Sequence, residues 1–140
     1  MLRIAIVGLG RAGMRHVEAI QELCRKITVD CLVDNDPEPP EREGNKTRHW
    51  KNVYRFSPCA RYPDVDVVSI CTPHNLHCPI ALEAAADKKH TLCEKPIAIT
   101  VADVTRMIDA AETNGVKLGS SKAFIRWILS KWLQIVWHVR

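Results

Sequence analysis

The residues of this chain that could do chemistry begin with three glycines in its first thirteen positions. They stand in the run Gly8-Leu9-Gly10-Arg11-Ala12-Gly13, directly after an apolar stretch. Glycines at this spacing permit a tight turn, let a diphosphate approach bare backbone, and let the following helix pack close to the strand. The start of that helix would offer unpaired N–H groups and a partial positive charge. The pattern therefore predicts a site for the pyrophosphate of a dinucleotide.

An acidic residue follows this turn at the distance where dinucleotide-binding folds place one. Residues 27–33 form an apolar run that predicts a strand, and Asp34 ends it, 21 residues after Gly13. A carboxylate in this position accepts the ribose hydroxyls and repels a 2′-phosphate. The first arginine after it is Arg42, so we expect NAD in preference to NADP. The alternative is a surface turn, because Asn-Asp-Pro follows Asp34.

The elements that position these residues alternate between strands and helices. Short apolar runs predict the strands, and apolar residues at helical spacing predict the helices. This alternation predicts an α/β fold with a doubly wound, mostly parallel sheet, whose ligands bind beyond the carboxyl ends of the strands. The expected strands are residues 3–7, 27–33, 53–56, 65–71, 90–93 and 116–119, and the expected helices follow Gly13 and cover 79–86 and 100–114.

The last of these helices carries its own start and stop signals. Thr100 and Asp103 form a capping pair at its beginning, and Asn114-Gly115 ends it. The apolar stripe expected on this helix is Val104, Ile108 and Ala111.

Three polar segments follow expected strands, at residues 8–13, 72–77 and 94–96. The carboxyl ends of parallel strands share one edge of a sheet, and ligands bind there. We therefore expect the three segments to line one crevice, with Asp34 at its adenosine side.

Four motifs occur in this chain in a fixed order: the glycine turn, Asp34, Cys71-Thr72-Pro73 followed by His77, and Cys93-Glu94-Lys95-Pro96. Together these motifs resemble the nucleotide-binding domain of the glucose–fructose oxidoreductase, inositol dehydrogenase and MocA family. The resemblance covers roughly residues 2–120. Its most diagnostic part is Glu-Lys-Pro, which a generic dinucleotide fold does not need.

The resemblance implies an NAD(P)-binding Rossmann fold in an enzyme that transfers hydride between a nicotinamide and a sugar, polyol or related hydroxyl carbon. It implies that Lys95 lies near the nicotinamide, where an ammonium can polarise the hydroxyl or shuttle a proton, and that Glu94 helps to position the cofactor. It also implies that Thr72, Pro73 and His77 line the cofactor crevice. The alternatives are a surface lysine in a Lys-Pro turn and a histidine that caps or packs at a helix start.

Members of that family carry a second domain that holds the substrate and a catalytic histidine. Nothing in residues 121–140 resembles that part, so we expect this chain to lack the substrate domain. This leaves a second function open, a non-catalytic dinucleotide-binding module. A third is a different ligand for the same fold, such as S-adenosylmethionine, against which Glu-Lys-Pro argues.

The stretch 121–140 is apolar and basic, and we treat it as a tail separate from a dinucleotide-binding domain over residues 1–120. It holds three of the four tryptophans and no acidic residue, and its polar residues recur every fourth position. This pattern predicts a helix with a wide apolar face, which is unfavourable unless other apolar groups cover it. We expect a truncation remnant that packs on the domain or on a second copy, and packing on a second copy would make a homo-oligomer. The alternatives are a dimer seam and a basic helix that lies at a membrane interface. The tail is too short and too charged for a membrane span.

Composition narrows the partners of this chain. The net charge of +4 comes from the tail alone, so the first 120 residues carry no net charge and no basic face for nucleic acid. The six cysteines lie in or beside apolar runs and are expected to be free thiols. Because the first strand begins at the N-terminus, there is no room for a signal peptide, and we expect a cytoplasmic protein.

A zinc site over residues 71–78 is the remaining possibility. Cys71, His74, His77 and Cys78 are suitable ligand types. Adjacent His77 and Cys78 would point in different directions, however, and a structural zinc needs four convergent ligands. We therefore expect no metal.

Overall fold

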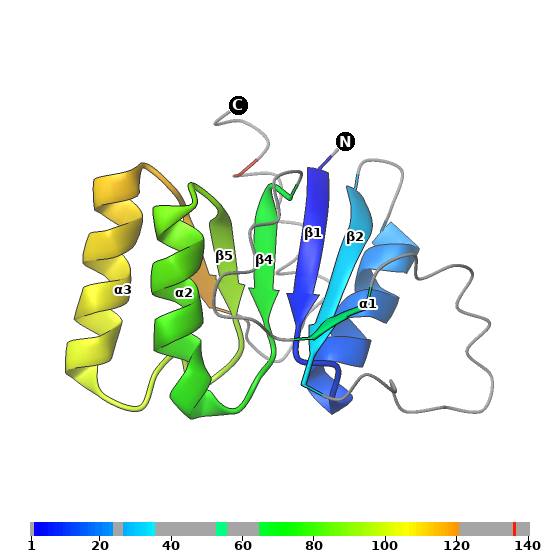
Figure 1. The fold of residues 1–140 in the computed structure, drawn as a ribbon, viewed down its shortest axis with the longest axis horizontal. Helices are drawn as coiled ribbons and strands as arrows, with labels where there is room; N and C mark the ends of the chain where they lie inside the picture. The colour runs from blue at the N-terminus through cyan, green and yellow to red at the C-terminus, as the bar shows by residue number, and fades with distance from the viewer. Residues whose placement is uncertain (1, 24–26, 36–52, 56–64, 121–135, 137–140) are drawn as a thin grey trace.

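The computed structural model describes residues 2–23, 27–35, 53–55, 65–120 and 136, and these form one sheet with helices on both faces (Figure 1). The strands are β1 (Leu2–Val7), β2 (Ile27–Asp34), β3 (Val53–Arg55), β4 (Val67–Ile70), β5 (His90–Cys93) and β6 (Leu118–Ser120). The helices are α1 (Arg11–Leu23), the 3₁₀ turn η1 (His74–Leu76), α2 (His77–Ala86) and α3 (Val101–Asn114).

The sheet has the order β3-β2-β1-β4-β5-β6, and each of its neighbouring strands pairs in parallel. The chain builds outward from β1 to β3, returns to the other side of β1, and continues to β6. The direction of winding therefore reverses between β1 and β4, which is where open α/β sheets bind their ligands. This confirms the predicted doubly wound parallel sheet.

The central strand β1 is buried on both sides, which explains its uninterrupted apolar sequence. Ile4 and Ile6 face α1 and pack with Val17. Ala5 and Val7 belong to a second cluster, which α2 and α3 complete on the opposite face. Figure 1 shows α2 and α3 side by side over one half of the sheet and α1 near β2. The core thus holds β1 rigidly, and with it the turn that follows.

Helix α3 begins and ends as its sequence predicts. The Thr100 hydroxyl accepts a hydrogen bond from the Asp103 N–H, and Gly115 takes the left-handed conformation with φ 68°. The Gly115 N–H then donates to Glu112 O and the Val116 N–H to Ala111 O, which is a Schellman ending. Val116 is used in this ending, so β6 begins at Leu118 rather than at the predicted residue 116.

The predicted apolar stripe of α3 is partly wrong. Met107 and Ala111 are the buried residues of this helix. Ile108 is 43% exposed, and Val104 is only half-buried. Positions 107 and 111 are four residues apart and so lie one above the other on one face. Met107 therefore takes the place that the prediction gave to its neighbour Ile108.

Of the tail, the structure describes Val136 alone. Its side chain is fully buried and belongs to the same apolar cluster as Leu2, Ile4 and Leu92. Contact with the domain therefore exists at this one position. The remainder of the predicted tail helix lies outside the described residues. In the part of the chain that the structure describes, no helix has the length and apolar character to cross a membrane.

Candidate cofactor site

The glycine turn is held between the ends of β1, β2 and β4. Gly8 has φ +91°, and a Cβ there would lie 2.7 Å from the Cys71 carbonyl carbon. A Cβ on Gly13 would lie 1.9 Å from the Gly8 oxygen, so α1 packs directly on the turn. A Cβ on Gly10 meets no described atom within 4 Å. Two glycines are thus required by the fold, and the third leaves open space above the backbone.

Asp34 lies directly beside this turn. Its Oδ2 accepts a hydrogen bond of 2.5 Å from the Leu9 N–H, and the Gly8 N–H donates to Val33 O at 2.8 Å. The end of β2 therefore supports the turn through both backbone and side chain. The Asp34 side chain is half-buried and hydrogen-bonded to the turn. Its position is one from which a carboxylate could reach a ribose next to a pyrophosphate.

The segment after β4 forms the opposite side of the turn. The Cys71 N–H donates to Val7 O at 2.7 Å, which extends the pairing of β1 with β4. The Thr72 hydroxyl oxygen is buried and has no hydrogen-bond partner among the described residues, and Pro73 is exposed. A buried hydroxyl without a partner is unfavourable by about 1–3 kcal/mol, so Thr72 is suited to contact a ligand.

His77 has a different place from the one expected for a residue that lines the crevice. Its side chain is fully buried. Nδ1 lies 2.9 Å from Pro96 O, and Nε2 lies 2.9 Å from Thr72 O. Carbonyl oxygens only accept, so the ring donates through whichever nitrogen carries a hydrogen. His77 therefore ties the segment after β4 to the Glu-Lys-Pro turn, and α2 begins at this residue, two positions earlier than predicted.

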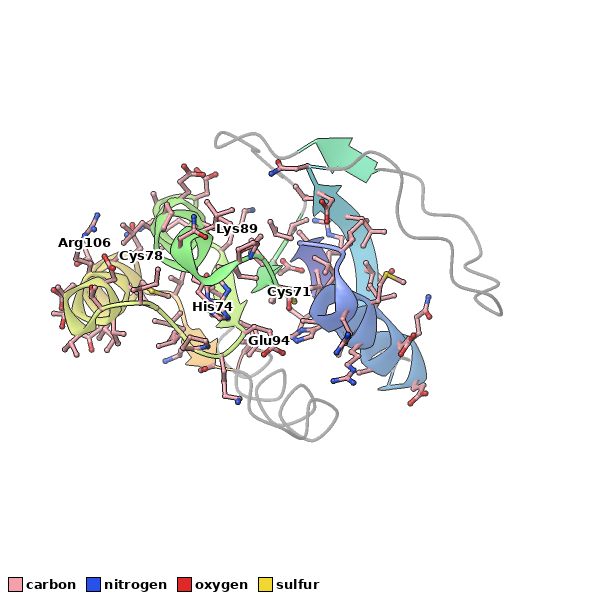
Figure 2. All side chains as sticks on the ribbon, turned by 90° about the horizontal axis from the view of Figure 1, so that it is seen from below. Cys71, His74, Cys78, Lys89, Glu94 and Arg106 are labelled. Carbon is pink, nitrogen blue, oxygen red and sulfur yellow. The ribbon has the colours of Figure 1, made fainter. Side chains whose placement is uncertain are left out.

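The Glu-Lys-Pro turn follows β5 at the same edge of the sheet. The Glu94 N–H donates to Ile70 O at 2.9 Å, and its Oε2 accepts from the Lys95 N–H at 3.0 Å. Lys95 itself is exposed, and the Lys95–Pro96 peptide bond is cis. Figure 2 looks onto the edge at which the arrowheads of Figure 1 end, and it shows Glu94 and Cys71 near the centre of that edge.

Sequence reasoning missed His16, which is fully buried and bonded to Glu94 and Ser69. A signal was present in the sequence. His16 precedes Val17 on the inward face of α1, where Gly13 and Ile20 also lie. A histidine within a buried helical face needs hydrogen-bond partners, and those partners lie far away in the sequence.

Two of the four residues considered as possible zinc ligands, His77 and Cys78, have other hydrogen-bond partners. Both His77 nitrogens contact carbonyl oxygens, and the Cys78 Sγ donates to Asp103 O at 3.8 Å. Burial raises the pKa of the Cys71 thiol far above its usual range. The hydrogen bond with Ser69 lowers this pKa, and the nearby Glu94 raises it. Within the described ranges, no group of three or more His, Cys, Asp or Glu side chains could hold a metal ion. The four described cysteines are buried free thiols.

These observations fit a dinucleotide better than they fit a metal. Three features lie where the direction of winding reverses: the open space at Gly10, the carboxylate beside the turn and the buried Thr72 hydroxyl. Helix α1 also begins there. Helix N-termini next to such a turn attract phosphate. The fold and this edge define a nucleotide-binding domain of the Rossmann type.

Comparison with known proteins identifies the family. Residues 2–121 match the model of the oxidoreductase family described as having an NAD-binding Rossmann fold. The chain belongs to this family, as the resemblance of its motifs predicted.

Individual relatives agree with this assignment. The chain is 32% identical over 130 residues to a myo-inositol 2-dehydrogenase of Thermotoga maritima, with 89% of this chain and 38% of the relative covered. An aldose-aldose oxidoreductase of Caulobacter crescentus, solved with glycerol, is 35% identical with a TM-score of 0.67, over 84% of this chain and 37% of that one. The WlbA dehydrogenase of Bordetella pertussis, solved with NADH and UDP-GlcNAcA, is 25% identical with a TM-score of 0.75, over 95% and 43%. The chain thus spans about two fifths of the length of these proteins.

Proposed function

We propose that this chain binds NAD at the carboxyl edge of its sheet, as the cofactor-binding part of an enzyme that oxidises or reduces a hydroxyl carbon of a sugar or polyol. One observation carries the proposal. The Asp34 carboxylate binds the Leu9 N–H beside the open Gly10, and the same sheet edge presents Lys95. In this proposal the turn would hold the phosphates, Asp34 would bind the ribose and Lys95 would move a proton.

The residues of the glycine turn take the diphosphate in this proposal. Gly8 and Gly13 hold the backbone in place, and Gly10 leaves it accessible. The N–H groups of Arg11 and Ala12 lie in the first turn of α1, whose partial positive charge favours an anion. The buried Thr72 hydroxyl, which has no partner among the described residues, would gain one from the bound cofactor. His77 supports this contact indirectly, because it holds the Thr72 carbonyl.

Asp34 favours NAD over NADP in this proposal. Its carboxylate would accept hydrogen bonds from the ribose hydroxyls and repel a 2′-phosphate. The support is its fixed position beside Leu9.

Lys95 is the residue proposed to act on the substrate. When bound, NAD supplies the hydride acceptor or donor at its nicotinamide ring. The exposed Lys95 ammonium would polarise the reacting hydroxyl or carry its proton. Glu94 holds the Lys95 backbone through its Oε2. The names of the two relatives at 32% and 35% identity suggest myo-inositol and aldoses as substrates to test.

NADH fluorescence titration of the full chain tests the proposed binding. We expect saturable binding that NAD displaces, that NADP displaces less well, and that S-adenosylmethionine leaves unchanged. Displacement by S-adenosylmethionine and not by NAD would overturn the proposal in favour of the third function.

An assay of NAD reduction with myo-inositol and aldoses tests turnover. Reduction that Lys95→Met abolishes, while NADH still binds, supports the catalytic role. Binding by the wild-type chain without turnover would favour a non-catalytic module.

A further inference from the structure

A buried histidine joins the helix that follows the glycine turn to the Glu-Lys-Pro turn. His16, on α1, is 0% exposed. Its Nε2 lies 2.8 Å from Glu94 Oε1, and its Nδ1 lies 2.8 Å from Ser69 Oγ on β4. These contacts connect α1 to residues 53 and 78 positions further along the chain. Three separate elements thus meet at one side chain.

The chemistry of these groups fixes the direction of the hydrogen bonds. A carboxylate only accepts, so His16 Nε2 donates to Glu94. The Ser69 hydroxyl can donate to Nδ1 or accept from it, so the chain of bonds survives whether His16 is neutral or protonated. Hydrogen bonds to a charged group are stronger than neutral ones, which makes the bond between His16 and Glu94 the main link.

Glu94 passes this restraint on to Lys95. With Oε1 bound to His16, its Oε2 accepts from the Lys95 N–H at 3.0 Å. The position of α1 is itself set by the contact of Gly13 with the Gly8 oxygen, one helical turn before His16. The location of the Lys95 backbone therefore depends on the location of the glycine turn.

We infer that His16 is a positioning residue that sets the Glu-Lys-Pro turn relative to the glycine turn. The inference rests on the proposed function, because it matters only if a dinucleotide occupies both turns. The pyrophosphate then lies at one end of the link and the nicotinamide at the other. His16 touches neither, and it acts through Glu94.

A matched pair of variants isolates the bond to Glu94. His16→Leu fills a similar volume without a donor, whereas His16→Gln can place an amide N–H where Nε2 lies. Arg106→Ala serves as a surface control, because the Arg106 side chain is 63% exposed on α3.

The first measurement needs no ligand. In amide NMR spectra of the full chain, we expect the Lys95 signal to shift in His16→Leu and to return toward its wild-type position in His16→Gln. The Glu94 amide donates to Ile70 O within the sheet, so its signal should hold in both variants. An unchanged Lys95 signal in His16→Leu would overturn the inference.

The second measurement compares NADH with ADP-ribose, which lacks the nicotinamide. We expect His16→Leu to weaken NADH binding by about tenfold, the size of a lost hydrogen bond to a charged group. ADP-ribose affinity should stay within about twofold, and His16→Gln should recover most of the NADH affinity. Equal losses for both ligands would show a general structural role and overturn the inference.

Failure of the proposed function gives a different result. In that case the wild-type chain binds neither ligand, and the positioning role falls with it, even if the Lys95 amide responds to His16→Leu. Wild-type binding of NADH with no difference between the variants overturns the positioning role alone.

Discussion

Gly10→Val should weaken NAD binding severely while the protein stays folded. A Cβ at Gly10 meets no described atom within 4 Å, and the structure gives Gly10 no left-handed φ. A valine should therefore fit with little change in the free energy of unfolding. Its side chain would occupy the space where the proposed pyrophosphate approaches the backbone. Displacing a phosphate from even one N–H group removes about 1.5–3 kcal/mol, or roughly 10- to 150-fold in Kd.

Gly13→Ala is the matched comparison within the same turn. Its Cβ would lie 1.9 Å from the Gly8 oxygen, a backbone atom that cannot turn aside. Helix α1 would have to move away from the sheet, which separates Val17 and Ile20 from the core. Overpacking of this kind costs about 1–3 kcal/mol and sometimes more. We expect a clear loss of stability in Gly13→Ala and none in Gly10→Val.

Thermal unfolding and NADH fluorescence of the two variants give the answer together. Wild-type NADH affinity in Gly10→Val would show that no phosphate lies against this turn, and the cofactor proposal would be abandoned. Equal destabilisation of the two variants would refute the inference that a side chain fits at position 10 but not at position 13.

Three further results are expected. Asp34→Ala should weaken NADH binding by about tenfold and reduce the preference for NADH over NADPH. Unchanged affinity for both cofactors would show that Asp34 is not part of the site. Thr100→Ala should lower the free energy of unfolding in urea by about 0.5–2 kcal/mol through loss of the helix cap; no change would mean that the cap is not stabilising. The hydrogen bond with the Thr100 hydroxyl holds the pKa of Asp103 below its usual 3.8. The stability that the ionised Asp103 contributes is therefore present above pH 3.8 and is lost as the pH falls below it. An equal fall in the free energy of unfolding of the wild type and of Asp103→Asn at acid pH would contradict this. Burial raises the pKa of Cys93 to about 12, so iodoacetamide should leave this thiol unmodified in the native protein and alkylate it after unfolding, as peptide mass spectrometry can measure.

Features set by local chemistry were predictable from the sequence. The turn at residues 8–13 and both ends of α3 depend on residues close together in the chain, and their backbone requirements leave few alternatives. Asp34 was predicted from its spacing after the turn. The order of alternating elements then implied a parallel sheet with its polar segments at one edge. The family assignment followed from the Glu-Lys-Pro motif, which no rule of local structure requires.

Features set by packing were not predictable in the same way. Spacing alone did not decide whether Met107 or Ile108 faces α2, because both lie close to the same helical stripe. The partners of His16 and His77 come from other elements, and only the three-dimensional register of those elements selects them. A buried histidine needs hydrogen-bond partners, but the sequence does not say which groups supply them.

The burial of Val136 bears on how a minimal folding unit of this chain should be cut. The family match ends at residue 121, and a fragment designed to that boundary would omit a side chain that is 0% exposed in the cluster of Leu2 and Ile4. Such a fragment would have a void against its first strand. A fragment made for expression or crystallisation should therefore keep the segment that carries Val136, although this segment contributes nothing to the motifs by which the family is recognised.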